Sequence, residues 1–288
     1  MRVIPDSELI INSDGSAFHL HIKPDQLSDK IVMMGDPGRV TLTASFFDTI
    51  ECDIESREFH TVTGTYKGKR ITALSHGIGT DNIDIVVTEL DALANIDFET
   101  RTVNEDFKQL TMVRVGTSGG IQPHCPVGSY VVSEKSLGFD GLIHYYEDSK
   151  KVRDEEFEVA FQKHVNWSPF HCFPYVVDSD EELVERIGHD MIRGVTISAI
   201  GFYGPQGRHV RLPIADPELN SRIESFRFNE HSITNYEMEG SAIAGLSKLM
   251  GHKAMTICAI NNNRVSLDSN ADYKGSIEDL IKIVLDRI

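Results

Sequence analysis

Cysteine is scarce in this sequence, and its few copies stand far apart. Cys52, Cys125, Cys172 and Cys258 form no CxxC pair among 288 residues. Two of them directly follow a histidine, but a lone adjacent pair lacks the further ligands that a zinc site requires. The spacing argues against a disulfide framework and predicts reduced cysteines that serve only the structure.

Basic residues and long hydrophobic runs are lacking as well. Lys and Arg total 28 against 44 Asp and Glu, which gives a formal net charge of −16. Such a surface repels phosphate backbones and anionic lipid heads, so we expect no nucleic-acid or membrane partner. No apolar run approaches the roughly 20 residues of a membrane-spanning helix. The first residues also lack the features of a signal peptide, and a cytoplasmic protein is expected.

The common nucleotide-binding fingerprints are missing too. Neither GxxxxGK[ST] nor GxGxxG occurs, so nucleoside triphosphates and nicotinamide cofactors lose support. What is present is the composition of a globular protein, with 40% hydrophobic and 25% charged residues. Strand-like and helix-like stretches alternate without an internal repeat. This pattern predicts an α/β fold with residues 1–288 in a single domain.

Local patterns predict the main elements of that fold. A strand at 31–34 precedes Asp36, which can cap a helix with Pro37 at its first position. Apolar residues follow Thr80 at helical spacing, and a capping box at Ser276 is expected to open the last helix. The other predictions are strands at 57–66, 70–75, 111–115, 130–133, 195–200 and 254–260, a glycine loop at 116–120, and helices capped at 216–217 and over 237–250.

The stretch from about residue 145 to 186 differs from the rest of the chain. It is rich in Glu, Asp and Lys, holds the only tryptophan, Trp167, and shows no clear period. We interpret it as a charged elaboration on the surface of the domain, not as a linker between two domains.

Three glycine-containing loops are candidates for binding an anion. They are Gly35-Asp-Pro-Gly-Arg39, Gly77-Ile-Gly-Thr80 and Arg114-Val-Gly-Thr-Ser-Gly-Gly120. Glycine lets backbone N–H groups approach an anion, and arginine offers a planar fork that matches phosphate oxygens. Together the loops indicate a phosphate pocket, although each one alone is also explained by a chain turn and a surface ion pair.

Two further segments carry groups suited to a base and a sugar. Gly201-Phe-Tyr-Gly-Pro-Gln-Gly-Arg208 brings an aromatic ring, an amide and a guanidinium into one short turn. Asn235-Tyr-Glu-Met-Glu239 supplies carboxylates that can accept hydrogen bonds from sugar hydroxyls. Taken alone, the first is also explained as a polar turn and the second as acids at a helix N-terminus.

In their order along the chain, these segments resemble the nucleoside phosphorylase family, and within it the uridine phosphorylases most. The resemblance covers about residues 18–264 and implies an α/β fold around a mixed, twisted central sheet flanked by helices. The matching segments are Phe18-His-Leu20, Gly35–Arg39, Ser56-Arg-Glu-Phe59, His76-Gly-Ile-Gly79, Arg114–Gln122, Phe202–Arg208, Tyr236-Glu-Met-Glu239 and Asn263-Arg264.

The resemblance also assigns roles to individual residues. The catalytic residues would be Arg114, Arg208 and Glu239. The binding residues fall into three groups: Gly35, Arg39, Arg57, Arg114 and Thr117 for phosphate; His19, Met238 and Glu239 for ribose; Phe202, Gln206 and Arg208 for the base. Because Arg57 and His19 match positions that reach across the family's dimer interface, the resemblance implies composite active sites. The assembly would be a homodimer, or a hexamer built as a trimer of dimers.

The implied activity is reversible phosphorolysis, in which a nucleoside and inorganic phosphate give a free base and a pentose 1-phosphate. The protein would be a pentosyltransferase of nucleoside salvage or catabolism, with phosphate as co-substrate and no organic cofactor. Some relatives bind a monovalent cation between subunits, so potassium is considered at Glu58, Ile78 and Asn82. Asn82 departs from the serine that is usual there.

Substrate specificity stays open at this point. Purine phosphorylases of the family usually carry an aspartic acid where this chain has Asn261 and Asn262, which favours uridine and other pyrimidine nucleosides. Uridine phosphorylases, however, are usually apolar at these positions, so purine or mixed specificity is an alternative. The retained Arg39, Arg57 and Arg114 argue against a nucleosidase that uses water. A non-catalytic nucleoside-binding protein is the remaining alternative.

Overall fold

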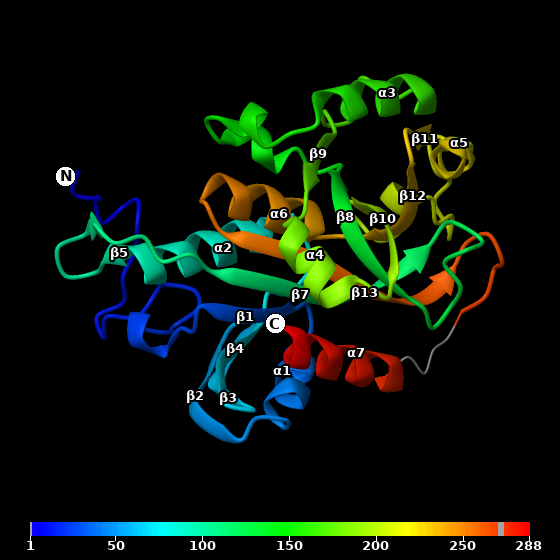
Figure 1. Cartoon of the computed structure of the whole chain (residues 1–288). Helices are drawn as coiled ribbons and strands as arrows, with labels where there is room; N and C mark the ends of the chain where they lie inside the picture. Colours follow the sequence, from blue (N-terminus) through cyan, green and yellow to red (C-terminus); the bar gives the residue numbers. More distant parts are fainter. Residues whose placement is uncertain (1, 270–273) are drawn as a thin grey trace.

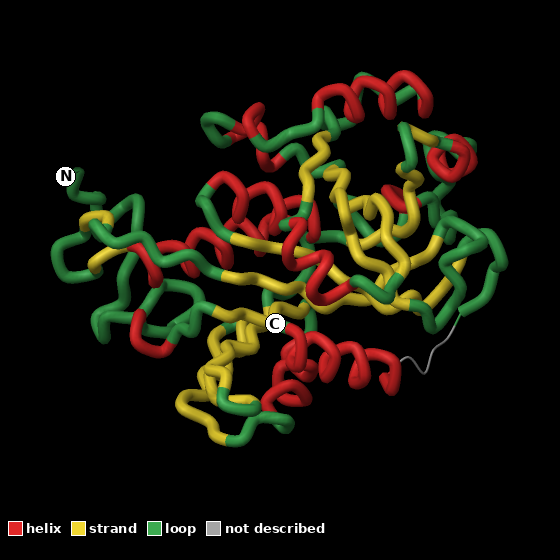
Figure 2. The backbone as a smooth tube through the Cα atoms, in the orientation of Figure 1, coloured by secondary structure: helices red, strands yellow, loops and turns green. Residues whose placement is uncertain are grey.

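A long mixed β-sheet runs through the protein, with helices on both of its faces (Figures 1 and 2). The computed structural model describes residues 2–269 and 274–288. The strands of this sheet are β1 (Lys30–Met34), β2 (Thr49–Ser56), β3 (Phe59–Tyr66), β4 (Lys69–Ser75), β7 (Thr111–Gly120), β8 (Tyr130–Gly138), β9 (Tyr175–Asp178), β10 (Ile192–Ser198), β11 (Arg227–Phe228), β12 (His231–Glu237) and β13 (Lys253–Asn263).

The strands follow the order β11-β12-β10-β8-β13-β7-β1-β4-β3-β2, and β9 pairs with β8 beside this path. β7 lies parallel to β1 and β13, whereas β13 pairs antiparallel with β8. A further antiparallel pairing of β12 with β7 joins β7, β12, β10, β8 and β13 into a closed circuit. The mixed α/β sheet predicted from the sequence is confirmed.

Helices cover the two faces of the sheet because successive strand residues point to opposite sides. Ile31 and Met33 of β1 pack in one core with α2 (Thr80–Asn95) and α6 (Gly240–Leu249). Val32 and Met34 pack in another core with α1 (Pro37–Ala44), α4 (Glu181–Gly188) and α7 (Lys274–Arg287). A third core holds α3 (Glu155–Val165) and α5 (Leu219–Ser225), and β5 (Ile96–Asp97) pairs with β6 (Thr102–Val103) away from the main sheet.

Several predicted elements form as expected, and others do not. Asp36 accepts the Gly38 N–H and caps α1, and α2 begins at Thr80. The predicted loop at 116–120 is wrong, because these residues extend β7 by pairing with β13 and β12. The helix expected over 237–250 begins only at Gly240, after β12 ends. Ser276 lies inside α7, so it does not open that helix.

The segment 145–186 is also more deeply integrated than predicted. It supplies α3, β9 and most of α4, and Phe157, Phe161 and Tyr175 are fully buried. The many charged residues made this burial hard to predict, because some of them pair with each other inside the fold. Buried Glu158 binds Arg153 and accepts the N–H of Val176 at 2.9 Å. The interpretation of the whole stretch as a surface elaboration is therefore wrong.

Candidate functional site

A cavity of about 420 Å³ opens where β1 and β4 end and β7 passes beside them. Parallel strands bring the groups that follow their carboxyl ends to the same edge of a sheet, which explains why distant motifs meet here. The predicted site residues that line this cavity are Gly35, Arg39, Ile78, Arg114, Thr117, Phe202, Gln206, Arg208, Met238 and Glu239.

Arg114 forms a buried network with two carboxylates at one end of this cavity. Its Nη1 lies 3.0 Å from Glu237 Oε2, and its Nη2 donates to Glu239. Glu239 also accepts the N–H of Gly79 at 2.7 Å. Burial by itself would lower the pKa of Arg114, but Glu239 and Glu237 raise it above its usual value. Arg114 therefore stays positive, and its Nε has no partner among the described residues.

Glycine is required where β7 passes behind this network. A Cβ atom at Gly116 would lie 2.4 Å from Nη1 of Arg114, and one at Gly119 would lie 2.7 Å from Oδ1 of Asn262. Both distances are too short for any larger residue without movement of the neighbour. Gly116 and Gly119, which were predicted to lie in a loop, therefore allow side chains of the site to pack closely against β7.

His76 is a buried residue of the segment His76–Gly79, and no role could be predicted for it from the sequence. Its ring lies beneath the phosphate-binding candidate Gly35, with Cε1 3.8 Å from the position of a Cβ there. Neither ring nitrogen has a hydrogen-bond partner among the described residues. Burial, together with the nearby charge of Arg114, lowers the pKa of His76 well below its usual value. The ring is therefore neutral at pH 7.

The other end of the cavity carries the predicted base-binding residues. Arg208 Nη1 donates to Gln206 Oε1 and to the carbonyl oxygen of Phe202, both at 2.5 Å. The Arg208 guanidinium carbon lies 3.7 Å from the centre of the Phe202 ring. Burial, followed by the charge of Arg264, lowers the pKa of Arg208 to about 10, so it is still positive at pH 7.

Arg264 is a second positive group near this end, and no role was predicted for it from the sequence. Its guanidinium carbon lies 5.6 Å from the centre of the Tyr236 ring, and its Nε and Nη2 are buried without a described partner. Burial lowers its pKa. The pair Asn263-Arg264 is one of the segments that match the family. The burial of Arg264 beside Arg208, however, depends on the path of β13 and could not be predicted from that pair.

Each carboxylate that lines the cavity within the described ranges is already engaged. Glu237 and Glu239 bind Arg114, and Asp36 accepts the Gly38 N–H at 2.8 Å. The lining also offers the two amides noted in the sequence, Asn261 and Asn262. Asn262 Nδ2 donates to Asn261 Oδ1 at 2.8 Å.

His19 and Arg57 do not line the cavity of this chain. They lie together elsewhere, with Phe18 between them. The Phe18 ring packs edge-on against His19 at 4.8 Å, and the Arg57 guanidinium carbon lies 5.6 Å from the centre of the same ring. His19 Nδ1 is held 2.6 Å from Glu89 Oε1. His19 and Arg57 therefore lie together with Phe18 at a place that, within one chain, is not part of the cavity.

The three cation-site candidates gather around Gly77. A Cβ at Gly77 would lie 2.3 Å from Asn82 Nδ2 and 3.2 Å from Glu58 Cγ, and Ile78 follows in the chain. Carboxylate and carbonyl oxygens suit hard cations. The residues thus offer compatible donors at one place, with the side chain of Ile78 exposed beside them.

Comparison with known proteins agrees with this geometry. The sequence profile of the phosphorylase superfamily matches residues 29–286. A uridine phosphorylase of Thermococcus kodakarensis is 28% identical over 264 residues, covering 88% of this chain and 79% of that protein. A DeoD-type purine nucleoside phosphorylase of Vibrio vulnificus is 25% identical, covering 94% and 96%.

Solved structures of similar proteins have the same fold as this chain. A Trypanosoma brucei nucleoside phosphorylase, described as showing uridine phosphorylase activity, aligns with a TM-score of 0.88 and 29% identity. The alignment covers 97% of this chain and 98% of that one. The family resemblance read from the sequence is confirmed: the chain belongs to the phosphorylase superfamily and is a pentosyltransferase.

Proposed function

We propose that this protein catalyses reversible phosphorolysis of uridine to uracil and ribose 1-phosphate, in cytoplasmic nucleoside salvage or catabolism. The observation that carries this proposal is the Phe202–Gln206–Arg208 cluster, which shares one cavity with Arg39, Arg114 and Glu239. Uracil presents two carbonyl acceptors and a ring N–H donor between them. An amide and a guanidinium in direct contact match that edge, and the Phe202 ring can pack on the face of the base.

The chemistry follows from the charges at the two ends of the cavity. Phosphate enters beside Arg39, Arg114 and Thr117, and Arg114 Nε gains the acceptor it lacks. The bond between C1′ and the base nitrogen breaks while an oxygen of hydrogen phosphate bonds to C1′, so the electron pair of the broken bond leaves with uracil. The uracil anion then takes up the proton that hydrogen phosphate gives up on becoming the ribose 1-phosphate dianion. Arg208 stabilises that negative charge, and the phosphate dianion stabilises the cationic sugar. Glu239 and Met238 orient the ribose.

Dependence on phosphate tests this proposal. A panel of uridine, deoxyuridine, thymidine, inosine and adenosine is incubated with and without phosphate, and the products are separated by chromatography. We expect uracil and ribose 1-phosphate from uridine only when phosphate is present. Equal rates without phosphate would assign a nucleosidase instead, and no cleavage of any nucleoside would favour a binding protein.

We further propose that the enzyme is a homodimer, or a hexamer built as a trimer of dimers, in which His19 and Arg57 complete the site of the neighbouring subunit. Their common position with Phe18, apart from the cavity, supports this. Arg114→Ala and Arg57→Ala chains, each inactive alone, are mixed under conditions of verified subunit exchange. Activity should return, because one of the two sites in each heterodimer keeps both arginines. Failure of the exchanged mixture to regain activity would contradict a shared site.

Purine nucleosides are a second candidate substrate class, favoured by the Asn261–Asn262 amide pair in the lining. An amide can hydrogen-bond a purine ring nitrogen without protonating it. If the enzyme acts on purines, Asn262→Ala should damage cleavage of inosine, and Arg208→Ala should leave it nearly unchanged. If the enzyme acts on uridine, as we propose, Arg208→Ala should damage cleavage of uridine and Asn262→Ala should leave it nearly unchanged.

A potassium ion at Glu58, Ile78 and Asn82 is the last part of the proposal. It would neutralise Glu58 and tie the turn between β2 and β3 to α2 near the subunit boundary. Thermal unfolding in potassium chloride and in tetramethylammonium chloride at equal ionic strength tests this. We expect a higher Tm in potassium, and the difference should disappear in Glu58→Gln.

A further inference from the structure

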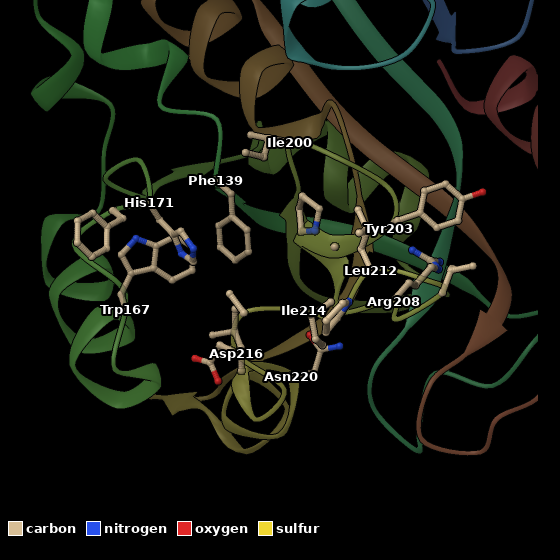
Figure 3. Close-up of a pocket in the computed structure, with 18 of the residues that line it drawn as sticks. Phe139, Trp167, His171, Ile200, Tyr203, Arg208, Leu212, Ile214, Asp216 and Asn220 are labelled. Carbon is tan, nitrogen blue, oxygen red and sulfur yellow. The ribbon is translucent and has the colours of Figure 1, made fainter.

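A second and larger cavity adjoins the candidate site (Figure 3). Its volume is about 820 Å³, within the range of roughly 300–1,000 Å³ that encloses small organic ligands. It shares Arg208 with the smaller cavity, and it is bounded by the turn Gly204–Gln206, the loop that follows, and residues near 170. Its walls are mainly aromatic and aliphatic, with Phe139, Trp167, Ile200, Tyr203, Leu212 and Ile214 (Figure 3).

The polar groups of this larger cavity favour an anion. Among the described residues, neither Arg208 nor Arg211 forms an ion pair with a carboxylate, although both line it. Asp216 is the acid of the described lining, and it is paired with Arg222. In a chain of net charge −16, two uncompensated arginines beside an apolar hollow form a local positive site.

Asn220 connects the larger cavity to the smaller one. Its Nδ2 donates to the carbonyl oxygen of Gln206 at 3.1 Å, and its Oδ1 accepts the Tyr236 hydroxyl at 3.0 Å. Gln206 and Tyr236 both line the smaller cavity. A Cβ at Gly207 would lie 2.3 Å from Asn220 Nδ2, so the turn fits closely against this side chain. Movement of Asn220 or Arg208 therefore moves the base-binding groups.

We propose that the larger cavity is an effector site for a small, flat aromatic anion. The ring system packs between Trp167, Phe139 and Leu212, and the anionic group pairs with Arg211 and Arg208. Engagement of Arg208 from this side weakens its contact with the departing base, so the ligand lowers kcat and kcat/KM for uridine. Binding depends on the cavity alone, whereas the effect on kcat/KM rests on the proposed function.

The only tryptophan of the chain lies in the wall of this cavity, so its fluorescence reports on it. The probe is anilinonaphthalene sulfonate, an aromatic anion that accepts energy from tryptophan. We expect saturable energy transfer from Trp167, with affinity weakened about tenfold by Arg211→Ala, as for one charged hydrogen bond. Leu212→Asp, which adds a negative charge at an exposed position, should weaken binding as well.

Val103→Asp is the matched control, because Val103 is also an exposed apolar residue but lies on β6, away from the cavity. Equal affinity in Leu212→Asp and Val103→Asp would overturn the site, as would binding that does not saturate. If the wild-type protein binds no probe and Leu212→Asp dissociates the oligomer in sedimentation, the surface is covered by a second copy and the proposal is wrong.

Kinetics with uridine test the coupling separately. In the wild-type protein, kcat and kcat/KM should fall severalfold as the probe saturates. In Asn220→Ala the ratio of kcat/KM without and with probe should fall toward one while the probe still binds. An unchanged kcat/KM in the wild-type protein would overturn the coupling. Saturable binding by a protein that cleaves no nucleoside would leave the cavity site standing and refute the proposed function.

Discussion

The two ends of the candidate site hold arginine in opposite ways. Arg114 is buried on a central strand between Glu237 and Glu239, so its charge is compensated before any substrate arrives. Arg208 lies on a short turn near Arg264, without a carboxylate partner in the described chain. One end is therefore built as part of the folded core, whereas the other keeps a positive charge that no carboxylate of the described chain compensates, as the proposed role toward the departing base requires.

Removal of Arg114 should produce the largest effect and separate the two ends most clearly. Arg114→Ala leaves Glu237 and Glu239 buried without their cation. An uncompensated buried charge costs about 3–5 kcal/mol of unfolding free energy. We expect this loss in urea unfolding, together with loss of measurable phosphorolysis. A variant as stable as the wild-type protein would show that the network does not support the fold.

Arg208→Ala should behave in the opposite way. Loss of a charged group that acts on the transition state costs on the order of 2–4 kcal/mol, or roughly a hundredfold in rate. We expect kcat and kcat/KM for uridine to fall together, with unfolding free energy unchanged. Gln206→Ala is the matched variant, and more of its effect should appear in KM. Near-native turnover of uridine by Arg208→Ala would refute the assignment of the base end.

Arg264→Met sharpens the comparison within the base end. Arg264 does not line the cavity, so its loss should cost less than that of Arg208, about tenfold in kcat/KM or 1.4 kcal/mol. Stability should stay constant or rise, because a buried guanidinium without a carboxylate is replaced by an apolar chain. Parallel urea unfolding and uridine kinetics measure both quantities. Destabilisation as large as that of Arg114→Ala would remove the distinction between the two ends.

The smallest expected effect concerns the pH dependence at His76. Its pKa is lowered by burial and by Arg114, so the unfolded chain binds a proton that the folded chain rejects. Stability contributed by this residue is complete above the unfolded pKa of about 6.5 and falls as the pH drops below it. When the pH falls from 7 to 5.5, the unfolding free energy of His76→Asn should therefore decrease by about 1 kcal/mol less than that of the wild-type protein. Identical pH profiles for the two proteins would contradict this.

Part of the candidate site could be predicted from the sequence because two of its motifs occupy turns with strong local signals. Asp36 and Pro37 mark the start of a helix, and Gly204 to Arg208 form one compact turn. The features that could not be predicted depend on pairing between strands that are far apart in the sequence. Residues 116–120 become strand only because β13 and β12 lie beside them, and Arg264 is placed by the same pairing.

The segment 145–186 was misinterpreted for a related reason. A count of charged residues does not reveal which of them pair with each other inside the fold. Arg153 and Glu158 are five residues apart, and together they allow α3 to bury Phe157 and Phe161. His76 is a similar case, because nothing local distinguishes a buried histidine from one at the surface.

The neighbours of β7 come from both ends of the chain, and this affects when the protein becomes active during synthesis. A nascent chain that has emerged as far as Met250 already contains Arg114, Glu237 and Glu239. It still lacks β13, so one edge of β7 is unpaired and the cavity wall at Asn261 and Asn262 does not exist. We therefore expect a ribosome-bound chain to be inactive until that strand has been released and has paired with β7.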